Sequence, residues 1–198
     1  PGVPRPGRAP VLPLLGLTQP SPSRSSASAS VRDGAVAAPI LAAMHRNVRA
    51  VVDAAAERGL TIEPRSYPDG TRTAQDAADA IGVEVGQIVK SLVFLVDGKP
   101  TMALVPGDRM LDESLLAAAA GGTEVERPDG DAVRAATGFP IGGVPPIGHP
   151  LPVYVDEGLL AYDEVWAAAG TWTDVFPVAP DELVRVTGGT VCELSTSA

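Results

Sequence analysis

The chain of 198 residues has little cysteine, few aromatic residues and no long apolar run. Its single cysteine, Cys192, excludes an intrachain disulfide and a multi-cysteine zinc site. We expect Cys192 to be a small buried residue in a terminal strand rather than a nucleophile. Aromatic residues make up 4%, so the core must consist mainly of Ala, Val, Leu and Ile. No apolar run approaches the length of a membrane-spanning helix, and no membrane partner is expected.

Basic charge is also scarce outside the first 35 residues. Residues 1–35 carry four arginines and one acid, whereas the remaining 163 residues carry 11 basic and 23 acidic side chains. A body this acidic is not a general binder of DNA or RNA, because such binding depends on neutralising phosphates. Any contact with a nucleic acid should therefore be local. Arg46 and Arg49, three residues apart on a predicted helix, are expected to pair with nearby acids rather than with RNA.

Composition divides the chain into a tail and one domain. Residues 1–35 are rich in Pro, Ser, Ala, Gly and Arg, which cannot bury enough apolar surface to offset the entropy of ordering. We predict a disordered tail over residues 1–35 and a folded domain over residues 36–198. The domain is long enough to bury a proper core.

Apolar periodicity and turn signals predict both helices and strands in the domain. Thr73 has the position of an N-cap, with Asp76 three residues later as in a capping box. Asp97-Gly98 predicts a hairpin turn, and Tyr67-Pro68-Asp69-Gly70 a turn. Helices are predicted over residues 40–58, 74–81, 85–87, 111–120, 131–137 and 180–186, and strands over residues 89–96, 100–106, 152–155, 165–169, 175–178 and 191–194. Paired strands outnumber regular βαβ units in the second half, which indicates an α+β fold with a mixed, largely antiparallel sheet flanked by helices.

Lys90 is the first residue that suggests chemistry. It lies near the start of an apolar strand, where a charged group is costly unless it is paired or faces a cavity. The alternative is an edge position from which the ammonium reaches water. Lys99, the other lysine of the domain, lies in the hairpin turn and needs no functional explanation.

The second such feature is the octapeptide Gly142-Gly143-Val144-Pro145-Pro146-Ile147-Gly148-His149. Glycine permits close backbone approach and proline fixes φ, so this segment is a shaped loop. Consecutive amides in such a loop can bind a carbonyl or an anion. Together with an inward lysine they would suit the polarisation of an ester, although the loop could also be an ordinary tight connection.

The other titratable residues favour structural roles. His149 could shuttle a proton, but a structural or lid role is the stronger expectation, and His45 is expected to be a structural residue of the first helix. Asp108 and Arg109 are predicted to form a turn, and the pairs Asp156-Glu157 and Asp163-Glu164 to be solvated on exposed turns. The chain has no G-x-S-x-G motif, no Cys/His pair and no His-rich metal set, so no metal or cofactor is expected.

Several motifs in order resemble the YbaK family, which is related to the editing domain of bacterial prolyl-tRNA synthetase. The resemblance covers roughly residues 48–194. The motifs that carry it are Thr73-Ala74-Gln75-Asp76-Ala77-Ala78, Ile88-Val89-Lys90-Ser91-Leu92, Pro106-Gly107-Asp108, and Thr137-Gly138-Phe139 running into the loop at Gly142.

The resemblance implies a mixed, barrel-like sheet and a site without a metal or a side-chain nucleophile. The family lysine corresponds to Lys90, and the G-x-x-x-P loop to Gly142 through Pro146, whose backbone would fix the acyl carbonyl and the attacking water. A family aspartate corresponds to Asp174. The implied set is Lys90, Gly142 and Asp174 as catalytic residues and Thr73, Gly143, Val144, Pro145, Pro146 and His149 as substrate-binding residues.

The implied function is hydrolysis of the ester between a wrong amino acid and its tRNA, in trans and in the cytoplasm. The expected substrate is tRNA-Pro carrying a small wrong amino acid, bound at its acceptor end, with an aminoacyl-tRNA synthetase as a further partner. The acidic charge motivates an alternative, a non-catalytic module that binds an aminoacyl or nucleotide-like ligand or associates with a synthetase.

Overall fold

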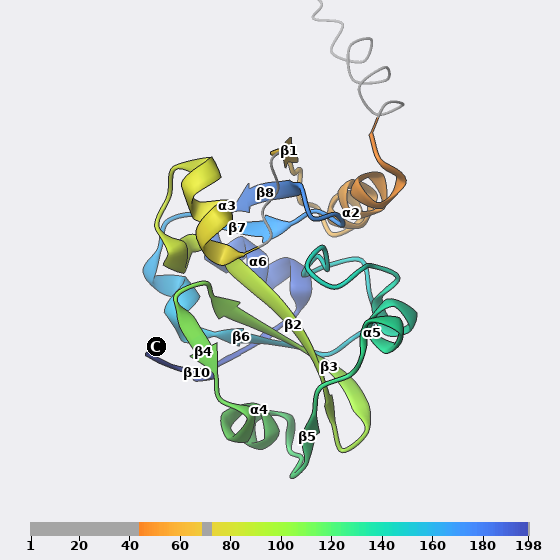
Figure 1. Cartoon of the computed structure of the whole chain (residues 1–198), viewed down its shortest axis with the longest axis vertical. Coiled ribbons are helices and arrows are strands. Elements are labelled where there is room, and N and C mark those ends of the chain that lie inside the picture. The colour runs from red at the N-terminus through yellow and green to blue at the C-terminus, as the bar shows by residue number, and fades with distance from the viewer. Residues whose placement is uncertain (1–43, 69–72, 198) are drawn as a thin grey trace, which may run out of the picture.

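The computed structural model describes residues 44–68 and 73–197 (Figure 1). Its largest sheet has five strands in the order β5-β2-β3-β6-β9. The long hairpin of β2 (Val89–Val96) and β3 (Lys99–Pro106) is antiparallel, and β5 (Val125–Glu126) extends it on one side. On the other side, β6 (Val153–Asp156) and β9 (Thr190–Cys192) add in parallel. The sheet is therefore mixed, as predicted.

Two smaller sheets complete the strand arrangement. One has the order β1-β8-β7, from β1 (Arg65–Ser66), β8 (Asp174–Val178) and β7 (Val165–Ala168), and the other pairs β10 (Ser195–Ser197) with β4 (Arg109–Leu111). A single parallel bridge from Ile88 to Trp166 connects the large sheet to the first of these. Within the described residues the strands form three sheets and not one closed barrel. The α+β class is confirmed.

The helices begin and end at residues whose capping roles are visible in the sequence. Thr73 and Asp76 form the predicted capping box at the start of α3, and Gly82, Gly121 and Gly138 end three helices in the left-handed conformation. The α-helices are α2 (Arg46–Glu57), α3 (Ala74–Ile81), α4 (Glu113–Ala120), α5 (Gly130–Thr137) and α6 (Pro180–Thr187), and the 3-10 helices are η1 (Val85–Gln87) and η2 (Glu157–Ala161). None of the described helices is long and apolar enough to cross a membrane.

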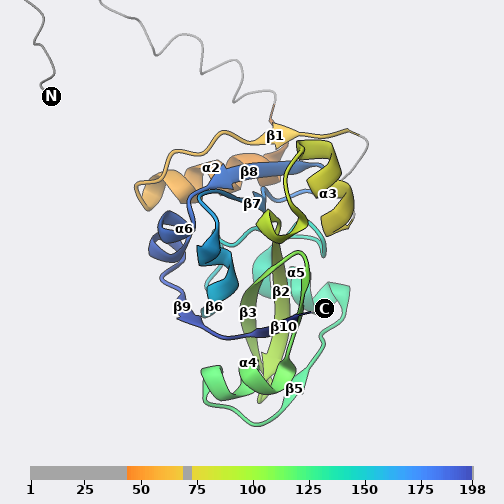
Figure 2. The same ribbon diagram turned by 90° about the vertical axis from the view of Figure 1, so that its left-hand side faces the viewer.

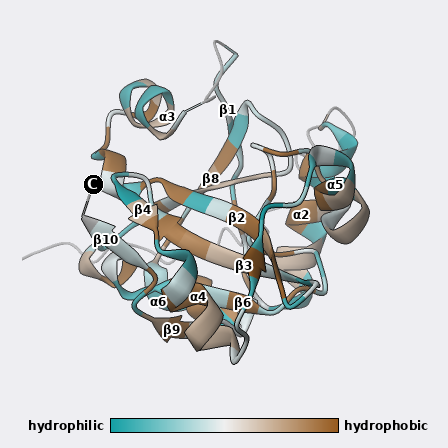
Figure 3. Ribbon diagram, turned by 60° about the horizontal axis from the view of Figure 1, so that its bottom comes forward, coloured by the Kyte–Doolittle hydropathy of each residue, from teal (hydrophilic) through white to brown (hydrophobic). Residues whose placement is uncertain are grey.

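Both faces of the central hairpin are buried. Met102 and Leu104 face a large cluster that includes Val51, Phe176 and Leu183, whereas Ala103 and Val105 pack with Leu116 and Leu194 on the opposite face. The hydropathy colouring shows apolar colour along β3 (Figure 3). Figures 1 and 2 place the β1-β8-β7 sheet with α2 and α3 at one end of the molecule, and α4 and β5 at the opposite end.

Several sequence predictions need correction. Met44 and His45 precede the first described helix, α2, which starts at Arg46, and His45 Nδ1 caps it by accepting from the Asn47 amide at 3.2 Å. Leu111 belongs to β4, because Asp112 caps α4 instead. Arg49 pairs with Asp53 as expected, but Arg46 has no ion pair within the described part of the chain. The predicted tail, residues 40–43 and the turn residues Asp69 and Gly70 lie outside the described residues.

Asp156 lies in an environment opposite to the predicted one. It was expected on an exposed turn, yet it is fully buried at the end of β6. Its carboxylate accepts hydrogen bonds from the Gly158 amide at 2.8 Å, the Leu194 amide at 3.0 Å and the Ser195 hydroxyl at 2.7 Å. Arg109 Nη1 lies 3.7 Å away. The carboxylate therefore anchors the C-terminal segment to the sheet. Asp163 and Glu164 are exposed, as predicted.

Candidate functional site

Lys90 and the glycine-proline loop meet in a pocket of about 340 Å³. The pocket lies between the start of α3, strand β2, the loop, and strands β7 and β8. Four of the predicted site residues line it: Thr73, Lys90, Gly142 and Val144. Its other lining residues are mostly small or apolar: Ala74, Ala77, Ile88, Val89, Ser91, Leu92, Ile141, Trp166, Ala168 and Val175.

Lys90 is half-buried on strand β2 and is held at its tip. Its Nζ donates a hydrogen bond to the main-chain carbonyl of Arg109, at the start of β4. Burial lowers the pKa of Lys90 below its ordinary value of 10.5, and the nearby carboxylate of Asp108 opposes that shift. The lysine thus lies on the pocket wall at a defined position and does not extend freely into solvent.

The loop is shaped by two glycines with different requirements. Gly142 has a φ of +82°, in the left-handed region that favours glycine. A Cβ on Gly143 would lie 2.8–3.0 Å from three backbone atoms of Thr171, so only glycine allows this close approach. Residues 143–147 are buried, and the Gly143 amide donates to the Pro140 carbonyl at 3.0 Å. The amides of Gly142 and Val144 donate to no acceptor among the described residues, which leaves two main-chain donors at the pocket.

Two further polar atoms at this pocket have no partner among the described residues. Ser91 Oγ and the Trp166 indole N–H are both buried without a hydrogen bond, and both residues line the pocket. Buried polar groups are normally hydrogen-bonded, so an unpaired one calls for an explanation such as a bound ligand or water. Neither residue is predicted from the sequence as a site residue. The only signal was that Ser91 follows Lys90 in an otherwise apolar strand.

His149 lies on the other side of the loop. It lines a separate pocket of about 410 Å³ with Asp53, Glu57 and Arg58. Its Nδ1 accepts from the Leu151 amide at 3.3 Å, so its Nε2 carries the proton and donates to the Pro145 carbonyl oxygen, 3.2 Å from Nε2. Burial lowers the pKa of His149; the Pro145 carbonyl opposes this shift and the Arg58 charge adds to it. A neutral His149 therefore braces the loop from outside the Lys90 pocket.

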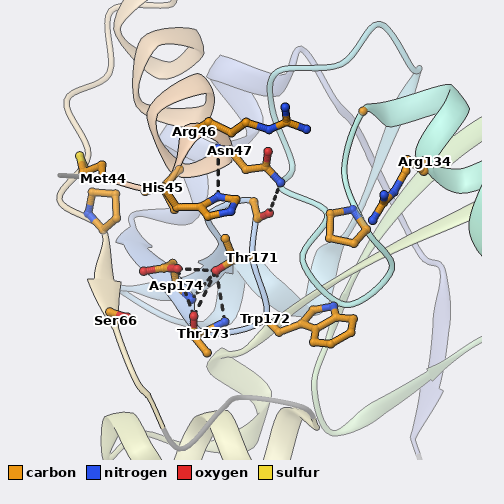
Figure 4. A pocket seen from close by; sticks show the side chains of 15 residues that line it. Met44, His45, Arg46, Asn47, Ser66, Arg134, Thr171, Trp172, Thr173 and Asp174 are labelled. Carbon is orange, nitrogen blue, oxygen red and sulfur yellow. Dashed lines mark hydrogen bonds between the residues drawn. The ribbon is translucent and has the colours of Figure 1, made fainter. Parts of the chain in front are cut away.

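Asp174 lies in a third and larger pocket of about 920 Å³ (Figure 4). Its carboxylate accepts from the hydroxyl of Thr171 and, at 3.2 Å, from that of Thr173. The Thr171 hydroxyl in turn accepts from the Asp174 amide at 3.1 Å. Asp174 thus holds the turn that carries Trp172. Pro145 and Pro146 are buried in the loop and line neither this pocket nor that of Lys90.

The chemistry available at the Lys90 pocket is that of charge and main-chain donors. The residues that line this small, mostly apolar pocket include Lys90, the amides of Gly142 and Val144 without a described acceptor, and the unpaired Ser91 and Trp166 side chains. Such groups can orient a carbonyl and stabilise an oxyanion. Within residues 44–68 and 73–197, no three His, Cys, Asp or Glu side chains gather as a metal site would require.

Comparison with known proteins identifies the family. A family model described as an aminoacyl-tRNA editing domain matches residues 68–186. This chain belongs to the aminoacyl-tRNA editing domain family. The match includes Lys90, the whole loop and Asp174, and it covers every residue that lines the Lys90 pocket.

Relatives of this editing domain include free-standing proteins and parts of larger ones. This chain is 32% identical over 127 residues to a protein of Enterococcus faecalis named as a Cys-tRNA(Pro)/Cys-tRNA(Cys) deacylase, EbsC. The match spans 77% of that protein. The chain is 36% identical over 106 residues to a proline–tRNA ligase of Maridesulfovibrio salexigens, but spans only 18% of the ligase. These matches cover 63% and 53% of this chain.

Solved structures agree with the fold of this editing domain. A crystal structure described as that of a trans-editing enzyme for prolyl-tRNA synthetase superposes with a TM-score of 0.74 at 44% identity, over 78% of this chain and 99% of the other. A second, named hypothetical protein APE2540, gives a TM-score of 0.69 at 33% identity, over 74% and 99% of the two chains.

Proposed function

We propose that this editing domain is an aminoacyl-tRNA deacylase that acts in trans. One observation carries the proposal: Lys90 and the unpaired amides of Gly142 and Val144 line the same small pocket. In a member of an editing family, that pocket is the natural place for an acyl group esterified to the end of a tRNA.

The reaction follows from the groups at the pocket. Water adds to the carbonyl carbon of the ester, the C–O bond to the terminal ribose breaks, and the ribose oxygen takes up a proton, which leaves a free amino acid and an uncharged tRNA. The amides of Gly142 and Val144 donate to the carbonyl oxygen as it becomes negative. The Lys90 ammonium binds the acyl carbonyl or the terminal nucleotide. Because an aminoacyl ester is already activated, orientation and oxyanion stabilisation can suffice without a side-chain nucleophile.

The proposed substrate is tRNA-Pro that carries a small wrong amino acid. The small volume of the pocket and its lining of Ala, Val and Ile support a small acyl group. The names of the relatives, which refer to Cys-tRNA(Pro) and to prolyl-tRNA synthetase, support the tRNA. A prolyl-tRNA synthetase is the proposed partner that delivers the mischarged product.

In this scheme three of the other predicted residues have positioning roles. Asp174 holds the turn of residues 170–173 against the loop, and His149 holds the loop through the Pro145 carbonyl. Thr73 uses its hydroxyl to cap α3 and thereby places the start of that helix at the pocket.

A panel of tRNAs charged with alanine, cysteine, serine or proline tests the proposal. Release of a small wrong amino acid from tRNA-Pro, with Pro-tRNA left intact, is the expected result. No release from any charged tRNA would overturn it. If a non-hydrolysable aminoacyl-adenosine analogue then bound without turnover of the matching ester, the chain would be a binding module instead.

A further inference from the structure

Trp172 lies on the wall between the Lys90 pocket and the large pocket that contains Asp174. Its indole N–H donates to the Ile141 carbonyl, and a Cβ on Gly142 would lie 3.1 Å from its ring. Ile141 and Gly142 line the Lys90 pocket, whereas Trp172 lines the large one. The two pockets therefore share a thin partition. Although it is a large aromatic residue, Trp172 is 56% exposed.

Two arginines face the same large pocket. Arg46 at the start of α2 and Arg134 on α5 extend from separate elements toward it, with Trp172 below them (Figure 4). Neither guanidinium forms an ion pair or a hydrogen bond with a described residue. By contrast, the arginines at positions 49, 109, 127 and 185 pair with carboxylates, Arg58 donates to the Ala54 carbonyl and Arg65 lies over the Trp166 ring. In a chain with a net charge of −9, two unpaired arginines beside one cavity indicate an anionic ligand.

The third feature of the large pocket is the carboxylate of Asp174. Its Oδ2 is engaged by the two threonine hydroxyls, but its Oδ1 accepts from none of the described residues. A carboxylate oxygen repels phosphate and accepts from an amino group, such as that of cytosine or adenine. The pocket thus presents two arginines, the aromatic ring of Trp172 at the partition and the carboxylate acceptor of Asp174.

We propose that this large pocket binds the unpaired nucleotides at the 3′ end of the tRNA. Trp172 stacks on a base, Arg46 and Arg134 bind the phosphates, and Asp174 Oδ1 accepts from a base amino group. This inference rests on the proposed function, because an acyl group in the Lys90 pocket requires the preceding nucleotides to pass over the adjacent surface. It explains how an acidic protein can hold a tRNA by a local contact.

Binding of the uncharged RNA tetranucleotide ACCA tests the pocket without any turnover. Calorimetric titration of the full chain should show Trp172→Ala weakening binding about tenfold, which lies within the range for the loss of one base stack. Arg46→Ala and Arg134→Ala should each reduce the slope of log K against log salt by about 0.7, as expected for one phosphate contact on a single strand. Arg49→Ala is the matched control on the same helix; because Arg49 pairs with Asp53, binding and slope should not change.

A kinetic comparison separates this inference from the proposed function. Arg134→Ala should raise KM for charged tRNA and leave hydrolysis of the minimal ester, alanyl-adenosine, unchanged, because Arg134 lines the large pocket but not the Lys90 pocket. If ACCA binds through Trp172 and the arginines but no ester is hydrolysed, the pocket assignment stands and the deacylase proposal fails. If esters are hydrolysed while ACCA does not bind, or while the Trp172 and arginine variants match the wild type, the pocket assignment is overturned.

Discussion

Replacing Asp156 with alanine should destabilise the fold more than the change of any exposed carboxylate. The substitution removes the acceptor for three hydrogen bonds, at 2.8, 3.0 and 2.7 Å, and the counter-charge of Arg109 at 3.7 Å. The Leu194 amide and the Ser195 hydroxyl lie in residues that are only 0% and 4% exposed, so water cannot replace the lost acceptor without local opening.

The expected loss in the free energy of unfolding is about 3–5 kcal/mol. Most of it comes from the buried hydrogen bonds, because the Arg109 side chain is 38% exposed and stays solvated. Hydrogen bonds to charged groups contribute about 1.5–3 kcal/mol each, so two lost bonds alone give a similar figure. Asp156→Asn keeps one carbonyl acceptor and should lose less. Because the Arg109 carbonyl holds Lys90, the alanine variant should also slow deacylation.

Urea unfolding of the wild type, Asp156→Ala and Asp156→Asn measures this effect. Asp163→Ala is the matched control, because Asp163 is exposed on a nearby turn and its loss should change stability by no more than about 0.5 kcal/mol. A loss below about 1 kcal/mol for Asp156→Ala would refute the reasoning, since it would place the carboxylate in a solvated environment.

Three further predictions concern the loop and the core. Because the folded state favours neutral His149, the free energy of unfolding should fall as pH drops from about 6.5 toward the lower pKa of His149 in the folded state. His149→Gln should remove this part of the pH dependence, as measured by urea unfolding. Gly143→Ala should lower the free energy of unfolding by about 1–3 kcal/mol and slow deacylation, because the new Cβ would overlap the Thr171 backbone. Gly130→Ala is the control: its Cβ would have no contact under 3.6 Å, so thermal unfolding should hardly change. Phe176→Ala should cost about 3–5 kcal/mol in the same assay, as for other fully buried aromatic residues.

Local patterns in the sequence were sufficient for the elements that depend on local physics. The capping box of Thr73 and Asp76, the hairpin turn at Asp97-Gly98 and the helix-ending glycines were all predictable, because each depends on residues only a few positions apart. The two-residue strands β1 and β5 were not predicted. They exist only because a partner strand that is distant in sequence lies beside them, and two residues show no periodicity.

The candidate site also has features that could be predicted from the sequence and features that could not. The convergence of Lys90 with Gly142 could be expected from a costly lysine, a shaped loop and the family resemblance. The unpaired Ser91 and Trp166 atoms could not, because an unmet hydrogen bond is defined by the three-dimensional neighbours. Asp156 was misjudged for a related reason: Asp-Glu-Gly has the composition of an exposed turn, and only the return of the C-terminal strand buries it.

The most direct test of the account is the single-turnover release of alanine from alanyl-tRNA-Pro by the wild type, Lys90→Ala and Lys99→Ala. Lys99 is an exposed lysine at the first residue of β3 and serves as the matched control. The account predicts that Lys90→Ala slows release about 10²–10³-fold, the cost of removing one transition-state donor, with an unchanged urea midpoint, while Lys99→Ala matches the wild type. Release by Lys90→Ala at the wild-type rate would contradict the central claim that the pocket of Lys90 and Gly142 is the site of deacylation.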